Sequence, residues 1–152
     1  MSESDKSRVS PELKTYLGAL HDIIASYHTR LSEVTSPKVA NQFLATMSDS
    51  AIHQLGLDQS DSMEDLRQFV TKLGMKLTIV PNQSGSTCTI ECPFANQVLP
   101  VLTSKTPICP ITILALGAAR TKQKGLTVTK MTLNEKGSET VIRKPDELNL
   151  SS

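Results

Sequence analysis

Two of the three cysteines in this chain, Cys92 and Cys109, are each followed directly by a proline. A cysteine thiolate can attack an electrophile, ligate a metal or exchange with a disulfide, so these residues are the first candidates for chemistry. The histidines that would assist such chemistry are His21, His28 and His53, all in the first half of the chain. The spacing of these side chains decides which kind of site the sequence can support.

The spacing does not favour a self-contained metal site. A structural zinc site usually contains a close pair of ligands within a set of four. Cys88 and Cys92 lie on a predicted strand, where four residues span about 13 Å at roughly 3.3 Å per residue. The chain has no histidine beyond His53, and the spacing of His21 and His28 predicts one solvated helix face. We therefore predict no metal ligands and no cofactor.

Cys109 is the stronger candidate for a reactive thiol. Because Pro110 favours the first position of a helix, Cys109 is predicted to cap a helix over residues 110–122. The backbone N–H groups and dipole at a helix start lower a thiol pKa. A nucleophile also needs a base, and no histidine is close in sequence. Alternatively, Cys92 and Cys109 approach each other and form a reversible redox pair, or both are simply small buried side chains.

The composition is that of a soluble globular domain. The chain has 152 residues, of which 38% are hydrophobic and 20% charged. No apolar run is long enough to span a membrane, and the first residues do not resemble a secretory signal, so we expect a cytoplasmic protein. Acidic side chains outnumber basic ones in residues 1–65, which disfavours nucleic-acid binding. The absence of tryptophan also disfavours base stacking.

Apolar periodicity predicts three helices in the first half of the chain. The first covers residues 11–35, and its apolar residues form a regular heptad seam: Leu13, Leu17, Leu20, Ile24, Tyr27, Leu31 and Val34. The seam is compatible with a core helix of the same domain or with a homodimer stalk. Two more helices are predicted, one from Pro37 to Gly56 and one that begins with Ser62 as its cap and ends at Gly74.

Residues after Gly74 alternate between apolar and polar types, which predicts strands. Two hairpins are expected, with the helix of residues 110–122 between them. The predicted fold class is α+β, with N-terminal helices packed on a four-stranded antiparallel sheet made of two hairpins. We expect one domain over residues 11–144, a disordered N-terminus at 1–10 and a frayed tail at 145–152.

The apolar residues between these elements predict either a solid core or a ligand cavity. Small residues in the helix after Cys109 permit close approach of the sheet. If a cavity exists, the candidates for its lining are Phe94, Leu77, Ile79, Ile90 and Ile113.

Two short segments, Cys92-Pro93-Phe94 and Pro107-Ile108-Cys109, carry a family resemblance over about residues 37–144. With these segments and its predicted order of helices, hairpin, helix and hairpin, the chain resembles the methanogen output domain, an archaeal regulatory domain. More distantly, it is similar to the 4-vinyl-reductase-type domain and the TRAPP/haem-nitric-oxide-binding superfamily. The resemblance implies a sensory or regulatory module, and the sequence shows neither a kinase nor a recognisable DNA-binding part.

Together these observations predict a stand-alone regulatory or ligand-sensing module that acts in signal transduction. Cys92 and Cys109 would sense redox state, a ligand or a metal. The output would pass through a signalling partner or a homodimer formed by Leu13, Leu17, Leu20, Ile24, Tyr27 and Leu31. The alternative is a hydrolase-like thiol enzyme with Cys109 as its nucleophile.

Overall fold

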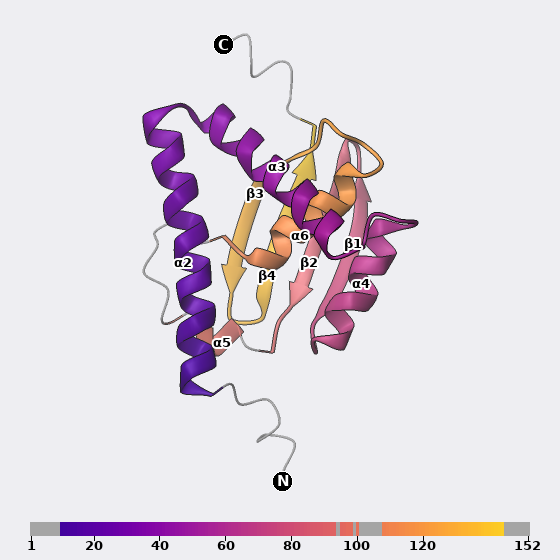
Figure 1. The fold of residues 1–152 in the computed structure, drawn as a ribbon. Helices are drawn as coiled ribbons and strands as arrows, with labels where there is room; N and C mark the ends of the chain where they lie inside the picture. The colour runs from indigo at the N-terminus through magenta and orange to yellow at the C-terminus, as the bar shows by residue number, and fades with distance from the viewer. Residues whose placement is uncertain (1–9, 94, 99, 101–107, 145–152) are drawn as a thin grey trace.

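The computed structural model describes residues 10–93, 95–98, 100 and 108–144. The predicted frayed tail, and all of the predicted N-terminal segment except Ser10, lie outside these residues. The elements follow one another as shown in Figure 1: α2 (Pro11–Val34), α3 (Pro37–Gln54), α4 (Ser62–Lys72), β1 (Lys76–Asn82), β2 (Gly85–Glu91), α5 (Ala95–Val98), α6 (Pro110–Arg120), β3 (Thr127–Asn134) and β4 (Gly137–Arg143).

Side-chain caps fix where the N-terminal helices begin. Ser10 Oγ accepts a hydrogen bond from the Leu13 N–H at 3.1 Å, and Ser36 Oγ accepts one from Val39 at 3.2 Å. Both caps precede a proline at the start of the helix, where the missing N–H costs nothing. The prediction that Ser62 caps α4 is wrong. Asp61 caps the helix, and Ser62 is buried as the first helical residue.

The four strands form one antiparallel sheet in the order β1-β2-β4-β3. Each outer strand pairs with its hairpin partner, and the two hairpins join through β2 and β4 in the centre. In the central pairing, Ile90 lies opposite Ser138 and Cys88 lies opposite Thr140. The predicted α+β fold, with N-terminal helices before the hairpins and a helix between them, is confirmed.

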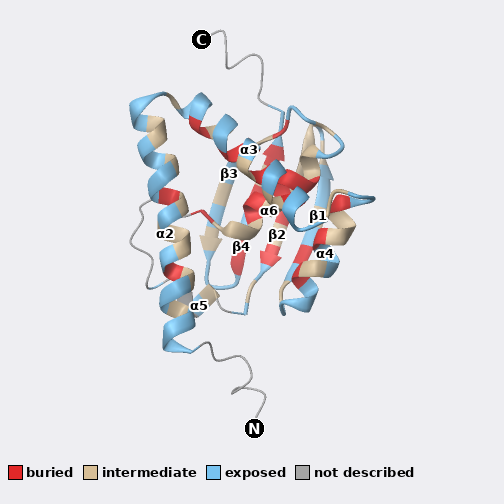
Figure 2. Cartoon of the chain, in the orientation of Figure 1, coloured by how far each residue is buried: buried red, intermediate tan, exposed pale blue. Residues whose placement is uncertain are grey.

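One face of the sheet carries the core, and the helices lie on that face (Figures 1 and 2). The inward side chains alternate along the strands and include Cys88, Ile90, Ser138, Thr140 and Ile142. Helix α6 lies against β2 and β4, while α3 packs on α6 and α4 packs on β1 and α6. Helix α6 is therefore central to the packing, with one end near α2 and the other against α3.

Helix α2 buries a different stripe from the heptad seam. Its fully buried residues are Gly18 and Ala25, and His21 lies between them on the same side. Of the seam residues, Leu13, Tyr27 and Val34 are exposed, whereas Leu17, Leu20, Ile24 and Leu31 are only partly buried. Small side chains let α2 approach the body of the molecule closely along this stripe. None of the helices in the described ranges has the length and apolarity of a membrane span.

Candidate functional site

A cavity of about 290 Å³ lies beneath the N-terminal half of α2, where the strand ends, α5 and the start of α6 meet. Its walls are mainly aliphatic, and its polar side chains include His21, Cys109 and Ser138. No lysine, arginine or carboxylate lines it among the residues described. The lining residues are Leu13, Leu17, His21, Leu73, Met75, Ile90, Cys92, Ala95, Cys109, Pro110, Ile111, Leu133, Asn134, Gly137 and Ser138.

Cys109 occupies the position before the first turn of α6, as predicted. Its side chain makes no capping hydrogen bond, and the Thr112 N–H donates to the Cys109 carbonyl oxygen at 3.0 Å. The backbone N–H groups of Ile111 and Thr112 nevertheless lie near the thiol and favour its charged form. Thr112 also anchors the helix to the sheet, because its hydroxyl hydrogen-bonds that of Thr140 at 2.9 Å inside the core. This anchor holds the N-terminus of α6 over β4, so that Cys109 lies near Ser138, two residues before Thr140 on the same face.

His21 provides the imidazole that the sequence did not place near Cys109. The two side chains line the same cavity and lie close enough to influence each other's pKa, although 88 positions separate them. The His21 Nδ1 atom lies 2.7 Å from the carbonyl oxygen of Leu17. Because that oxygen can only accept, Nδ1 carries a proton, which leaves Nε2 to face the thiol. The Leu17 carbonyl therefore orients the ring, as a third group does in other thiol sites.

In this pair, the pKa of Cys109 is shifted toward the thiolate, and the pKa of His21 is shifted toward the imidazolium. Burial opposes the charge on Cys109, but His21, the backbone N–H groups and Ser138 together hold its pKa below the ordinary value. Burial likewise opposes the charge on His21. The nearby Cys109 thiol, the hydrogen bond with Leu17 and the nearby charge of Asp22 raise its pKa above the ordinary value.

The sequence-predicted site residues separate into two groups. Cys92, Cys109 and Ile90 line the same cavity. The cavity lining does not include Leu77, Ile79 or Ile113. Leu77 and Ile79 pack in the main core cluster, and Ile113 packs in a smaller one. Phe94 lies outside the described residues. Cys92 and Cys109 share one cavity wall and are both present as thiols.

The remaining cysteine and the other two histidines do not line this cavity. Cys88 is fully buried, and burial, only partly offset by a hydrogen bond with Ser86, raises its pKa to about 11. His28 Nε2 lies 3.0 Å from Asn41 Oδ1, and His53 pairs with Asp58 near the surface. The prediction that His21 and His28 share a solvated face is wrong, because both are partly buried against other elements. Within the described ranges, no three His, Cys, Asp or Glu residues are grouped closely enough to hold a metal ion.

Sequence reasoning missed His21 and Ser138, although each had a local signal. Gly18, His21, Ala25 and His28 are spaced by three, four and three residues, which places them on one helix face beside the leucine seam. Glycine and alanine on that face indicate a close helix contact. Ser138 alternates with Thr140 and Ile142, a pattern that places all three on the inward face of a strand.

Comparisons with family models, curated proteins and solved structures find no match to this chain. The cavity and the residues that line it therefore provide the evidence on function.

Proposed function

We propose that this chain is a regulatory module that senses a small apolar molecule through the thiol of Cys109. The observation that carries the proposal is the placement of Cys109 beside His21 at the wall of an apolar cavity. The cavity volume is near the lower end of the range for small-molecule sites. A thiol with enhanced thiolate character in such a cavity can report an electrophile or oxidant by becoming modified.

Helix α2 supports the proposal because it connects the cavity with the surface. His21 faces the cavity, while Tyr16, Ile23 and Tyr27 expose 60%, 65% and 57% of their surfaces on the same helix. A change at Cys109 would alter the contact that holds His21 and thereby the seating of α2. The proposed output is a homodimer, in which Tyr16 and Ile23 extend the contact predicted for the heptad seam, to which Tyr27 belongs. The resemblance to an output domain and a cytoplasmic setting, which keeps thiols reduced, belong to the same proposal.

Alkylation with iodoacetamide across pH tests the sensing thiol. We expect Cys109 to reach half of its maximal rate below the value near pH 8.5 that is typical of free cysteine. His21→Gln should shift that midpoint upward and reduce the rate at pH 7 severalfold, because the variant loses the imidazole partner. His28→Gln is the matched control, since His28 lies on the same helix and contacts Asn41 instead. An ordinary or higher midpoint for wild-type Cys109 would contradict the proposal.

The dimer is tested separately by light scattering. A dimer would have twice the 16.5 kDa mass of the chain. Ile23→Glu places a charge on the exposed face of α2 and should convert the dimer to a monomer without changing Cys109 alkylation. A wild-type monomer at high concentration would exclude this route of output and leave the sensing site untouched.

A thiol enzyme is the second candidate, and the orientation of His21 by the Leu17 carbonyl favours it specifically. In that case His21 would accept the thiol proton and return it to a leaving group. The two functions differ in stoichiometry. A sensor reacts once per chain with an activated ester, whereas an enzyme releases many equivalents of the leaving group, so a steady-state rate above the first equivalent would favour catalysis.

A further inference from the structure

Ser138 carries a buried hydroxyl group at the polar end of the cavity. The residue exposes only 3% of its surface, and it is among the residues that line the cavity. Its Oγ atom makes no hydrogen bond of ordinary geometry with any described residue. It is close enough to Cys109 to favour the thiolate, but this is the weakest of the influences on that thiol. Buried hydroxyl groups almost always have hydrogen-bond partners, so we expect a bound molecule to provide the partner that Ser138 lacks.

The surroundings of Ser138 restrict what that missing partner can be. Cys109 and His21 lie at the same end of the cavity, while Leu17, Met75 and Ile90 provide an apolar wall. The described lining has no lysine or arginine that would pair with a carboxylate or phosphate, and its one basic side chain, His21, faces the thiol. The ligand should therefore have an apolar body and one neutral oxygen acceptor next to its reactive carbon. Walls this apolar hold little water, which disfavours a hydrolytic step.

We infer that the cavity binds an apolar α,β-unsaturated carbonyl compound, whose oxygen accepts a hydrogen bond from Ser138 while Cys109 adds to its β-carbon. This inference rests on the proposed sensing role of Cys109. The thiol proton passes to His21 Nε2 as the thiolate forms. A carbon–sulfur bond then forms, the carbon–carbon π bond breaks, and the electron pair moves to the carbonyl oxygen beside Ser138. Proton return from His21 to the α-carbon completes the addition without an oxidant, a leaving group or water.

The test compares two reagents on the same variants. Nonenal is an apolar α,β-unsaturated aldehyde, and iodoacetamide reports only the reactivity of the thiol. Intact-mass spectrometry of the full chain should show one nonenal adduct, which Cys109→Ser removes. Ser138→Ala should lower the ratio of the nonenal rate to the iodoacetamide rate about tenfold, because the developing negative oxygen loses its donor. The saturated aldehyde nonanal should leave no stable adduct.

Ser62→Ala is the matched control, since Ser62 is also a buried serine without a hydrogen-bond partner but does not line the cavity. Its rate ratio should equal that of the wild type, and urea midpoints would verify that both variants are folded. An unchanged ratio in Ser138→Ala, or a wild-type rate with nonenal no higher than with the polar acceptor acrylamide, overturns the inference. If iodoacetamide still reacts in a His21-dependent manner, the sensing thiol stands and only the ligand class fails. If iodoacetamide does not react with Cys109 in a His21-dependent manner, the proposed function itself fails.

Discussion

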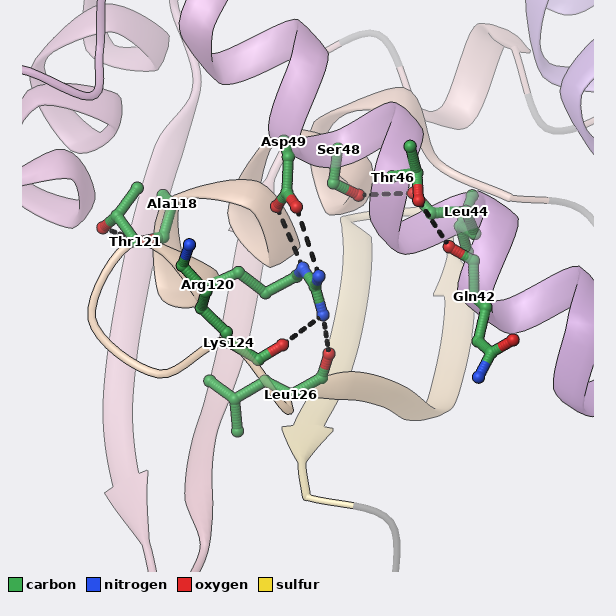
Figure 3. Close-up of polar contacts among 10 residues, drawn as sticks. All are labelled: Gln42, Leu44, Thr46, Ser48, Asp49, Ala118, Arg120, Thr121, Lys124 and Leu126. Atoms are coloured by element: carbon green, nitrogen blue, oxygen red, sulfur yellow. Dashed lines mark hydrogen bonds and ion pairs between the residues drawn. The ribbon is translucent and has the colours of Figure 1, made fainter.

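The two ends of helix α6 have opposite characters. At its C-terminal end, Arg120 donates to Asp49 on α3 at 2.9 and 3.2 Å and to the backbone carbonyls of Lys124 and Leu126 (Figure 3). Gly117 brings the helix against the backbone of Ser48, leaving no space for a side chain. At its N-terminal end, the same helix borders a cavity that is lined by the Cys109 thiol and by a serine whose hydroxyl has no hydrogen-bond partner among the described residues.

This difference shows how one element can provide both stability and a site. A helix that is fixed at one end by close packing can hold the other end over a cavity without collapsing into it. Protein interiors are packed nearly as densely as organic crystals, so a cavity with polar groups at its wall is unusual. The contrast predicts that changes near Gly117 and Arg120 alter stability, whereas changes near Cys109 alter chemistry.

The largest expected effect is that of Gly117→Ala. An added Cβ would collide with the Ser48 carbonyl and with Ile52, so α3 and α6 would have to separate. We expect a loss of about 3 kcal/mol in the free energy of unfolding, measured by urea denaturation. Gly125→Ala, where a Cβ would have no atom within 4 Å, should change stability by less than about 0.5 kcal/mol. Equal stabilities for the two variants would show that the C-terminal end of α6 is not closely packed.

The next largest expected effect distinguishes the core thiol of Cys88 from the cavity thiol of Cys109. The folded-state pKa of Cys88 is raised to about 11, so its contribution to stability is fully present below its unfolded pKa and is lost as pH rises toward 11. Between pH 9 and 10.5 the wild type should lose about 2 kcal/mol through this thiol, at about 1.4 kcal/mol per pH unit. Cys88→Val, which cannot ionise, should lose correspondingly less in urea denaturation over the same range.

The pKa shift of Cys109 has the opposite sign to that of Cys88. Its folded-state pKa is lowered, so its contribution is present above the unfolded pKa and is lost as pH falls through the folded value. If Cys88→Val and the wild type lose stability in parallel above pH 9, the assignment of Cys88 as an inert core thiol is wrong.

Most of the fold was predictable because its signals are local. The change from helical periodicity to alternation located the two hairpins, and the Ser-Pro pairs at Ser10 and Ser36 located two helix starts. The position of Cys109 at the start of α6 was predicted for the same reason. Each of these features depends on residues within a few positions of one another.

The site was not predictable because it depends on contacts between distant segments. A heptad seam identifies apolar residues but does not identify the partner that a helix packs against. Helix α2 instead packs through Gly18 and Ala25, which brings His21 to Cys109. The cavity prediction used apolar residues of the strands and of α6, but Leu77 and Ile113 pack in core clusters and do not line the cavity. Residues of α2 and of the adjoining ends of β3 and β4 complete the wall.

The smallest expected effect separates two contributions at Arg120. Arg120→Met removes both the ion pair with Asp49 and the hydrogen bonds to the Lys124 and Leu126 carbonyls, whereas Asp49→Asn removes only the charge of the partner. The Asp49 side chain is 49% exposed, so its charge should contribute less than about 0.5 kcal/mol. The Arg120 side chain is only 18% exposed, and its loss should cost about 1.5 kcal/mol, because the two carbonyls lose their donor. Urea denaturation at low salt and at about 1 M salt measures both, and the Asp49→Asn effect should disappear at high salt. If Asp49→Asn costs as much as Arg120→Met, the ion pair rather than the carbonyl contacts fixes this end of α6.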